Sequence, residues 1–168
     1  IRMNAGCFNA EFKDVLISIQ VVDYNGKVFT IVANKINFSY RETDLPKNYI
    51  FLSASFKGIK KNKKDIEEET DKLKNQKELV QPIRIKTSGS TFKNPIEQTD
   101  KKVWKLIKES VPQDTRFGEA EISSKHCNFF VNKKNASFKD MKKLITFVKE
   151  RVKEKTGINI DLEIILVE

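Results

Sequence analysis

The stretch VLISIQVVDYNGKVFTIV, residues 15–32, carries the strongest structural signal in the chain. Every odd position from 15 to 21 is Val or Ile, and this period of two is typical of a β-strand with one wholly apolar face. Asn25-Gly26 separates that run from a second apolar run at 28–32. Because Asn-Gly between two such runs is a strong hairpin signal, the stretch predicts two antiparallel strands.

The segments that follow extend the hairpin and then end it. YIFLSASF at 49–56 predicts a third strand, and Pro46 indicates a connecting loop before it. Residues 58–80 are rich in Lys, Glu, Asp and Asn, and their thin apolar stripe consists of Ile59, Ile66, Leu73 and Leu79 or Val80. This pattern predicts a largely solvent-exposed helix that separates two units.

The second unit combines helices with short strands. A helix is predicted at 101–110, ended by Pro112, and the residues expected to face inward are Val103, Trp104, Leu106 and Ile107. Short strands are predicted at 119–123 and 128–131, and a last strand, INIDLEIILV, at 158–167. The expected fold class is α+β, with a sheet-rich first domain at 1–79 and a second domain at 80–168.

The clearest helix signal begins at Ser137. Ser-Phe-Lys-Asp is the Ser-x-x-acid pattern, in which the first side chain caps the helix and the acid lies near its positive end. Gly157 is the expected end of the helix. The apolar positions repeat at intervals of three and four, and they are Met141, Leu144, Ile145, Val148 and Val152.

Charge and composition restrict the class of partner. The 168 residues carry a net charge of +9 with a pI of about 9.4, which favours an anionic partner, either nucleic acid or a charged metabolite such as a diphosphate. Cys7 and Cys127 lie far apart, which is typical of neither a zinc site nor a disulfide framework and fits a reducing compartment. No apolar run approaches the length of a membrane span.

Several common catalytic arrangements are excluded. His126 is the only histidine, so a metal site with two or more His is impossible and no metal is expected. A Ser-His-Asp triad would have to use His126, although the Gly-x-Ser-x-Gly pattern is absent. The phosphate-binding glycine motifs are absent as well. We therefore expect His126 to be structural or to support a neighbouring residue.

Three polar residues stand out from their surroundings. Ser90 lies in KTSGSTFKNP at 86–95, which predicts either an ordinary surface turn or a rigid loop that presents one hydroxyl. Arg41 follows Tyr40 in a mixed, polar segment. Glu163 lies within the apolar last strand, where a carboxylate either faces solvent together with Asp161 or is buried with a partner. From the residues alone, these alternatives stay open.

Longer motifs follow one another along the chain: RMNAGCFNAEFKD, FSYRETDLP, QPIRIKTSGSTFKNP, SSKHCNFFVN and GINIDLEI. In this order, and at close to this spacing, they resemble the UDP-N-acetylenolpyruvoylglucosamine reductase (MurB) family, in the more compact of its two subtypes. The resemblance covers nearly the whole chain. Its most specific parts are GSTFKNP and the Tyr-Arg pair.

The resemblance implies a reaction. The family uses FAD and NADPH to reduce the enolpyruvyl group of UDP-N-acetylglucosamine enolpyruvate to UDP-N-acetylmuramate, in the cytoplasmic phase of peptidoglycan synthesis, on which cell wall biogenesis, cell shape and cell division depend. Ser90 would be the general acid, which protonates the carbon next to the carboxylate after a hydride from the reduced flavin has added to the terminal carbon. Arg41 and Glu163 would hold and polarise that carboxylate.

The same resemblance implies binding residues and partners. Tyr40, Lys93 and Asn94 would contact the UDP-amino sugar, and Asn4, Ala5 and Gly6 would contact the flavin. The expected partners are therefore that substrate and NADPH, with no nucleic acid and no membrane, and the protein is expected to be a monomer.

The chain departs from the family pattern at a few positions. Asn9 stands where the family has Gly, Val80 where Lys is common, and Asp161 where Glu is usual. The family's longer N-terminal portion, with the glycine-rich loops that hold the FAD pyrophosphate, is not among the 168 residues. Residues 1–79 are therefore expected to be the end of the FAD-binding domain and 80–168 the substrate domain, and the chain alone is expected to be inactive.

Two alternatives belong to other classes. One is a non-enzymatic basic module that binds nucleic acid or another polyanion, for which steep salt dependence would be diagnostic. Against it, Lys and Glu alternate in 58–80, and most Phe residues fall at strand or core positions rather than beside cations. The other is a truncated, non-catalytic remnant of the reductase.

Overall fold

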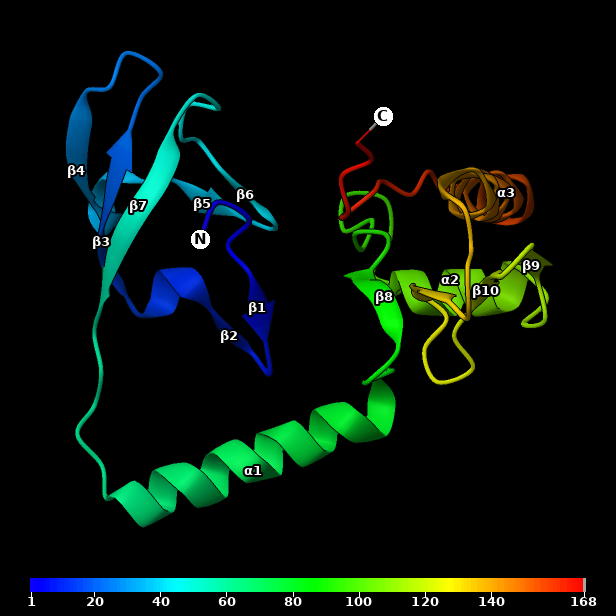
Figure 1. The fold of residues 1–168 in the computed structure, drawn as a ribbon, viewed down its shortest axis with the longest axis horizontal. Helices are drawn as coiled ribbons and strands as arrows, with labels where there is room; N and C mark the ends of the chain where they lie inside the picture. The colour runs from blue at the N-terminus through cyan, green and yellow to red at the C-terminus, as the bar shows by residue number, and fades with distance from the viewer. Residues whose placement is uncertain (168) are drawn as a thin grey trace. The chain divides into compact units, whose positions relative to one another are not determined.

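The computed structural model describes residues 1–167, which form two compact units (Figure 1). The first unit is Ile1–Asn62, and the second begins at Lys63. The first unit is built from antiparallel strands and two short 3-10 helices, whereas the second combines an antiparallel sheet with three α-helices. The α+β class expected from the sequence is confirmed.

The first unit contains a three-stranded sheet and two small ribbons. Its elements are β1 (Gly6–Cys7), β2 (Ala10–Glu11), η1 (Phe12–Asp14), β3 (Leu16–Val22), β4 (Val28–Val32), η2 (Ala33–Lys35), β5 (Phe38–Ser39), β6 (Glu42–Thr43) and β7 (Ile50–Phe56). The sheet has the order β4-β3-β7, and β1-β2 and β5-β6 are the ribbons. All of these pairs are antiparallel.

The predicted hairpin is confirmed as β3 and β4, and the predicted third strand as β7. Asp23 closes the turn: its N–H donates to the carbonyl of Lys27 at 3.0 Å, and its carboxylate accepts the N–H of Asn25 at 2.9 Å. Gly26 has a φ of 80°, a left-handed conformation that glycine adopts without steric cost. The Asn-Gly pair therefore sets the position of the hairpin.

Only the second half of the predicted apolar face of β3 is buried. Ile19 and Val21 are buried, at 1% and 0% exposure, but Ile17 is 49% exposed and Leu16 is buried instead. The register between β3 and β7 shifts between Leu16 and Ser18. A shift of this kind moves neighbouring side chains to the opposite face of a sheet. The prediction of one continuous apolar face is therefore wrong at the start of the strand.

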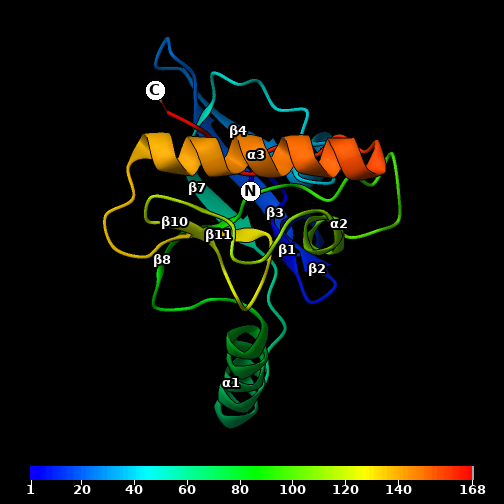
Figure 2. The ribbon, with the colours of Figure 1, turned by 90° about the vertical axis from the view of Figure 1, so that its right-hand side faces the viewer.

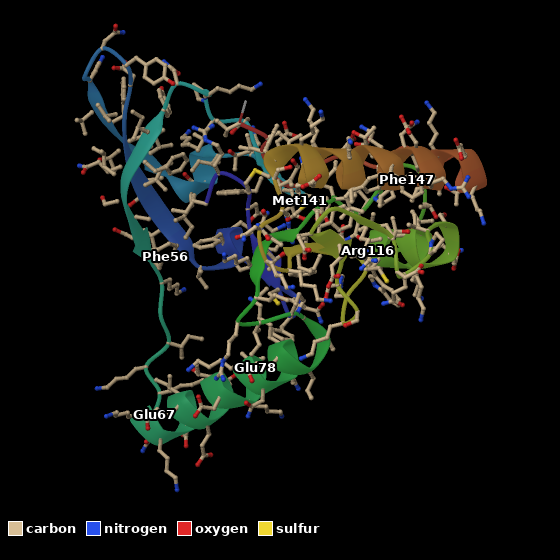
Figure 3. The ribbon with its side chains drawn as sticks, turned by 45° about the vertical axis from the view of Figure 1, so that its right-hand side comes forward. Phe56, Glu67, Glu78, Arg116, Met141 and Phe147 are labelled. Atoms are coloured by element: carbon tan, nitrogen blue, oxygen red, sulfur yellow. The ribbon has the colours of Figure 1, made fainter. Side chains whose placement is uncertain are left out.

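The predicted solvent-exposed helix is confirmed as α1, Lys63–Val80, which has no buried residue (Figure 3, where Glu67 and Glu78 mark it). The Nζ of Lys63 lies 3.7 Å from Oε1 of Glu67, one helical turn further along the chain. Cα packing groups α1 with the second unit, so the packing boundary precedes Lys63. A functional boundary after residue 79 stays a prediction. No helix within residues 1–167 has the length and apolar character that crossing a bilayer requires.

The rest of the second unit is a four-stranded sheet packed against two helices. Its elements are β8 (Lys86–Ser90), α2 (Val103–Ser110), β9 (Arg116–Phe117), β10 (Ala120–Ile122), β11 (Phe129–Asn132) and α3 (Phe138–Thr156). The antiparallel strand order is β8-β11-β10-β9. α3 is seen end-on in Figure 1 and lengthwise in Figure 2, whereas α2 is seen the other way round, so the two helices cross steeply. The predicted strands at 119–123 and 128–131 correspond to β10 and β11.

α3 is the helix expected after Ser137. The Ser137 hydroxyl accepts the N–H of Asp140 at 3.1 Å, and the Asp140 carboxylate accepts the N–H of Ser137 at 3.0 Å. Gly157 follows the helix with a φ of 73°. Met141 and Phe147, labelled in Figure 3, pack against the core. The apolar repeat buries Leu144, Ile145, Val148 and Val152.

Three predictions in this unit are wrong. Lys86–Ser90 is strand β8, although its small polar residues predict a loop, because pairing with β11 overrides local propensity. Trp104 does not face the core: it is 37% exposed. The last segment forms no strand, and its one bridge joins Leu162 to Phe92. Its alternate apolar residues are wholly or partly buried by packing against the core rather than by strand pairing. They are Ile158, Ile160, Leu162, Ile164 and Leu166.

Candidate functional site

Tyr40 and Arg41 form the two-residue turn between β5 and β6, where Ser39 pairs with Glu42. Arg41 has a φ of 57°, a left-handed conformation that costs a residue with a Cβ roughly 1–2 kcal/mol. Turn positions of this kind usually carry Gly or Asn. A long cationic residue held in this conformation indicates a function for its side chain.

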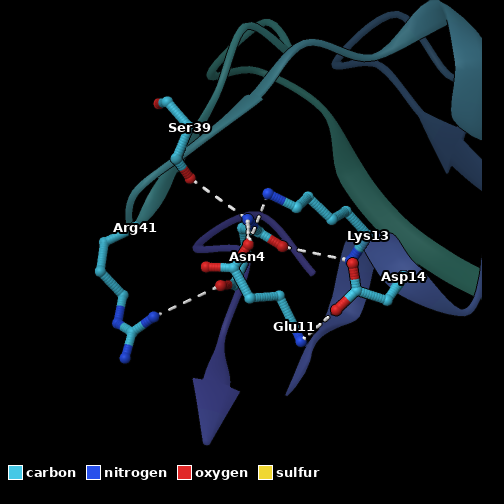
Figure 4. Close-up of polar contacts among 6 residues, drawn as sticks. All are labelled: Asn4, Glu11, Lys13, Asp14, Ser39 and Arg41. Atoms are coloured by element: carbon cyan, nitrogen blue, oxygen red, sulfur yellow. Dashed lines mark hydrogen bonds and ion pairs between the residues drawn. The ribbon is translucent and has the colours of Figure 1, made fainter. Parts of the chain in front are cut away.

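The Arg41 guanidinium lies against main-chain carbonyls of the N-terminal segment, and Figure 4 shows its bond to the carbonyl of Asn4. Its Nη1 is 3.5 Å from the carbonyl oxygen of Asn4, and its Nη2 is 3.3 Å from that of Gly6. Its Cζ lies 5.0 Å from the centre of the Tyr40 ring. The first unit therefore brings the predicted catalytic cation together with predicted substrate-binding and cofactor-binding residues.

Asn4 is fully buried, at 0% exposure, and its side chain joins separate segments. Its Nδ2 donates to Glu11 Oε2 at 3.1 Å and to the carbonyl of Ser39 at 3.2 Å, and its Oδ1 accepts the N–H of Lys13 at 3.2 Å. A side chain with all these internal partners orders the segment from within. The motif predicts a flavin contact at Asn4, but its side chain bonds to the chain itself.

Glu11 forms an ion pair beside Asn4. Its Oε2 lies 2.7 Å from Lys13 Nζ. The hydrogen bond from Lys13, supported by the Asn4 amide and by the positive charge of Arg41, holds the pKa of Glu11 below its usual range despite partial desolvation. The same bond raises the pKa of Lys13. Both groups are therefore charged at neutral pH.

Ala5 directly precedes Gly6, which is the first residue of the β1-β2 ribbon. Its turn residues Phe8 and Asn9 have φ angles of 52° and 61°, and Asn is one of the few residues that adopts this conformation readily. Asn9 therefore suits the backbone of a position where the family has Gly. A Cβ on Gly6 would lie 2.8 Å from the carbonyl oxygen of Ala10. Ala5 is exposed, and its carbonyl accepts the N–H of Phe12 at 3.1 Å.

Ser90 is the last residue of β8 and pairs with Phe129 of β11. Gly89, before it, has a φ of 88°, and the β8-β11 register shifts at this end of the ladder. Ser90 itself is half-buried. Of the two interpretations of KTSGSTFKNP, the one with a hydroxyl held by rigid backbone agrees better with this geometry, although the backbone is a strand end rather than a loop.

The buried Asn128 fixes the two residues after Ser90. Its carbonyl accepts the N–H of Thr91 at 2.8 Å. Its side chain accepts the N–H of Phe92 at 2.9 Å and donates to the carbonyl of Phe92 at 2.8 Å. Sequence reasoning did not single out Asn128, and its Asn-Phe-Phe context is the only signal that could have found it.

The last segment of the chain runs beside Thr91 to Lys93. The N–H of Glu163 donates to the carbonyl of Thr91 at 2.9 Å, and the N–H of Lys93 donates to the carbonyl of Asp161 at 2.8 Å. Glu163 is half-buried, whereas Asp161 is exposed. The second unit therefore brings the predicted catalytic Ser90 and Glu163 onto adjacent segments.

Asn94 has a structural partner at the start of α2. Its Oδ1 accepts the N–H of Val103 at 3.0 Å, which satisfies one of the unpaired donors of the first helical turn. Lys93 and Asn94 are both half-buried. The predicted substrate-binding pair thus lies between Ser90 and α2.

A pocket of about 510 Å³ lies in the same unit. Two lysines and no carboxylate line it; the lining residues are Leu79, Val80, Gln81, Trp104, Lys108, Gln113, Ser124, Lys125, His126 and Cys127. The His126 ring lies 6.4 Å from Trp104 and 4.9 Å from Phe129, measured between ring centres. Burial lowers the pKa of His126, so the ring is neutral at pH 7. Aromatic rings with two cations suit an anionic group.

Known proteins share these elements. A protein-family model described as the C-terminal domain of UDP-N-acetylenolpyruvoylglucosamine reductase matches residues 81–167. The reductase of that name from Pelagibacter ubique (strain HTCC1062) is 67% identical over 164 residues, which cover 98% of this chain and 54% of the relative. The one from Rickettsia conorii is 38% identical over 98% of this chain and 55% of the relative. The chain spans about half the length of the curated relatives it matches.

The fold is similar to that of a solved relative. The crystal structure of UDP-N-acetylenolpyruvylglucosamine reductase (MurB) from Thermus caldophilus matches with a TM-score of 0.79 and 31% sequence identity. The match covers 96% of this chain and 56% of that chain, so it includes residues of both units. With the family model matching 81–167, the chain belongs to the UDP-N-acetylenolpyruvoylglucosamine reductase family.

Proposed function

We propose that this chain is part of an oxidoreductase that reduces the enolpyruvyl group of UDP-N-acetylglucosamine enolpyruvate to UDP-N-acetylmuramate, with FAD and NADPH. The observation that carries the proposal is the 2.9 Å hydrogen bond from Glu163 to Thr91. This bond joins the segment that contains Glu163 to Thr91, the residue directly after the predicted proton donor Ser90. The family membership supplies the substrate class.

In this proposal Ser90 donates the proton. A hydride adds to the terminal carbon of the double bond, the π electrons move to the neighbouring carbon, and the proton from Ser90 Oγ forms the new C–H bond there. A serine hydroxyl is a weak acid, so it must be held in line with the carbanion and be reprotonated afterwards. The β8-β11 pairing and Asn128 support that role, because they fix the backbone on both sides of Ser90.

Arg41 and Glu163 stabilise the charge that develops on the substrate carboxylate. Hydrogen-bond donors and cations placed at a developing oxyanion lower a barrier by roughly 3–4 kcal/mol each. Arg41 supplies a permanent cation. Glu163 would act on the same carboxylate through its own carboxyl group.

Tyr40, Lys93 and Asn94 would bind the UDP-amino sugar. The net charge of +9 attracts a diphosphate over long range. The pocket with Lys108, Lys125 and Trp104 offers cations and a flat ring to the nucleotide part of such a ligand.

Bound FAD would supply the hydride, and NADPH would reduce the flavin. Ala5 and Gly6 would hold the flavin through main-chain atoms. Asn4 would contribute by fixing this segment from inside. We place this reaction in the cytoplasmic phase of peptidoglycan synthesis, and so in cell wall biogenesis, cell shape and cell division, with the enzyme acting as a monomer.

The test uses what we call the joined reductase, in which this chain is fused to the part of the P. ubique relative that it does not cover. Stopped-flow absorbance separates flavin reduction by NADPH from flavin reoxidation by the enolpyruvyl sugar. Ser90→Ala should leave reduction unchanged and slow reoxidation by roughly 10²–10⁴-fold, the usual range for a general acid. Ser88→Ala, two residues away on the same strand, is the matched control.

Equal loss in both half-reactions of Ser90→Ala would remove the proton-donor assignment. Assay of the 168-residue chain beside the joined reductase tests the expected inactivity of the chain alone. A chain that ignores UDP sugars but binds nucleic acid with steep salt dependence would favour the basic-module alternative. Against that alternative, α1 alternates charges along its surface, as in the pairs Lys63–Glu67 and Lys64–Glu68.

A further inference from the structure

Glu11 has no role in the reaction described above, yet its carboxylate bonds to the residue that supports Arg41. We propose that Glu11 is a positioning residue for Arg41 and acts through the side chain of Asn4. The inference rests on the proposed function, in which Arg41 polarises the substrate carboxylate. It assigns to Glu11 a part in the reaction that neither the sequence motif nor the exposed surface indicates.

Glu11 holds the side chain of Asn4 by a hydrogen bond. The Asn4 amide is buried at 0% exposure, and its Nδ2 donates to Glu11 Oε2 at 3.1 Å. A carboxylate can only accept hydrogen bonds, so it requires the NH₂ end of the Asn4 amide to face it. A charged acceptor also makes roughly twice as strong a bond as a neutral one. Glu11 therefore reinforces the orientation of the Asn4 amide that the Ser39 carbonyl and the Lys13 N–H also favour.

Asn4 in turn bonds to the residue before the turn that carries Arg41. With its NH₂ end facing Glu11, Asn4 also donates to the carbonyl of Ser39 at 3.2 Å. Ser39 directly precedes the Tyr40-Arg41 turn. Arg41 has a φ of 57°, and a backbone in this conformation persists only where the surroundings hold it. The bond to Ser39 is part of what holds it.

The segment around Asn4 also holds the guanidinium of Arg41. The carbonyls of Asn4 and Gly6 accept from Arg41 Nη1 and Nη2 at 3.5 and 3.3 Å, so the segment that Glu11 anchors is also the surface on which the cation rests (Figure 4). Both bonds are long, and a small shift of the segment would break them. The charged groups around Glu11 are Lys13, Asp14 and Arg41; Asp14 accepts the N–H of Glu11 at 2.7 Å.

The experiment is a double-mutant cycle in the joined reductase with Glu11→Gln and Arg41→Lys. Glu11→Gln removes the charge at nearly constant shape and gives the Asn4 amide a partner that can also donate. We expect it to slow flavin reoxidation by the enolpyruvyl sugar by roughly tenfold or more, the scale of effect of a displaced catalytic group, and to leave reduction by NADPH unchanged. In the Arg41→Lys background the same change should have little further effect. Glu42→Gln removes the same charge next to Arg41 in the sequence, keeps the Asn4–Glu11 bond, and serves as the control.

A crystal structure of the Glu11→Gln variant gives a readout independent of activity. It should show the Arg41 guanidinium displaced from the carbonyls of Asn4 and Gly6. If Glu11→Gln loses its flavin, Glu11→Asp, which keeps the charge but shortens its reach, is measured in the same way. Additive effects with Arg41→Lys, equal slowing of both half-reactions, or an unmoved guanidinium would overturn the inference alone. A joined reductase without variants that fails to reduce the enolpyruvyl sugar would overturn the proposed function and this inference with it.

Discussion

Glu163 and Asp161 lie two residues apart and have different surroundings. The main chain of Glu163 is bonded to Thr91 at 2.9 Å, and its side chain is half-buried. Asp161 is exposed, and its carboxylate lies 3.9 Å from Lys149 Nζ. An exposed ion pair of this kind contributes about 0–1 kcal/mol. At the scale of single residues, the two acids are therefore a matched pair for testing the catalytic assignment.

Glu163→Gln should lower the turnover of the joined reductase more than its affinity for the enolpyruvyl sugar, because we propose that its carboxyl group acts when charge develops on the substrate. Asp161→Asn should change both values by less than about threefold, since it removes only a solvent-exposed pair. Steady-state kcat and KM for the two variants check this. The reverse order would show that the catalytic acid of the last segment is Asp161.

At the scale of elements, α3 depends on its first turn. The N–H and hydroxyl of Ser137 donate to the Asp140 carboxylate at 3.0 and 2.7 Å, and these bonds hold the pKa of Asp140 below its ordinary value of 3.8. A carboxyl whose pKa is lowered by folding stabilises the folded state above its unfolded pKa. That stabilisation is lost as the pH falls through the lower, folded pKa.

The thermal midpoint of the protein should therefore fall less steeply on acidification when Asp140 is replaced by Asn. We expect the gap between the native chain and Asp140→Asn to be largest near about pH 6 and to shrink below about pH 4. Ser137→Ala, which removes one partner of the carboxylate, should shift the dependence in the same direction. A gap that stays constant from about pH 6 to pH 3 would mean that the cap contributes nothing through its charge.

The elements that the sequence predicts well are those with local signals. Ser137 and Gly157 mark the ends of α3, and Asn25-Gly26 marks the β3–β4 hairpin. The bulge beside Leu16, the strand character of β8 and the single bridge of the last segment depend on partner strands elsewhere in the chain. Local patterns hold no information about such pairing, so an alternating apolar run predicts a strand even where only packing is present.

The candidate site divides in the same way. Ser90, Arg41 and Glu163 could be named because they lie in motifs that resemble a known family. Asn128 lies in such a motif too, but its partner Phe92 is 36 positions away, so the motif does not indicate what it bonds to. Glu11 also lies in a motif, but its bond to the buried amide of Asn4 is visible only in the fold. Supporting residues become visible only when the fold shows what they touch.

At the scale of the whole molecule, the predicted chemistry is shared between two units. Arg41 and the Asn4 segment belong to the first unit, and Ser90, Lys93, Asn94 and Glu163 belong to the second. Arg41, the proposed polarising cation, thus belongs to one unit, and Ser90, the proposed proton donor, belongs to the other. We propose that the 168 residues supply the proton in a reduction whose other reactant is a hydride.

The most direct test of that claim is the NMR spectrum of the product that the joined reductase forms from the enolpyruvyl sugar and NADPH in D₂O. Ser90 exchanges its hydroxyl proton with solvent, so we predict deuterium on the carbon next to the carboxylate. The hydrogen on the terminal carbon is not diagnostic, because it would pass through a reduced flavin, whose N–H also exchanges with D₂O. Slower formation of the same product by Ser90→Ala would agree with this. A product without deuterium at the carbon next to the carboxylate, or no product at all, would contradict the account.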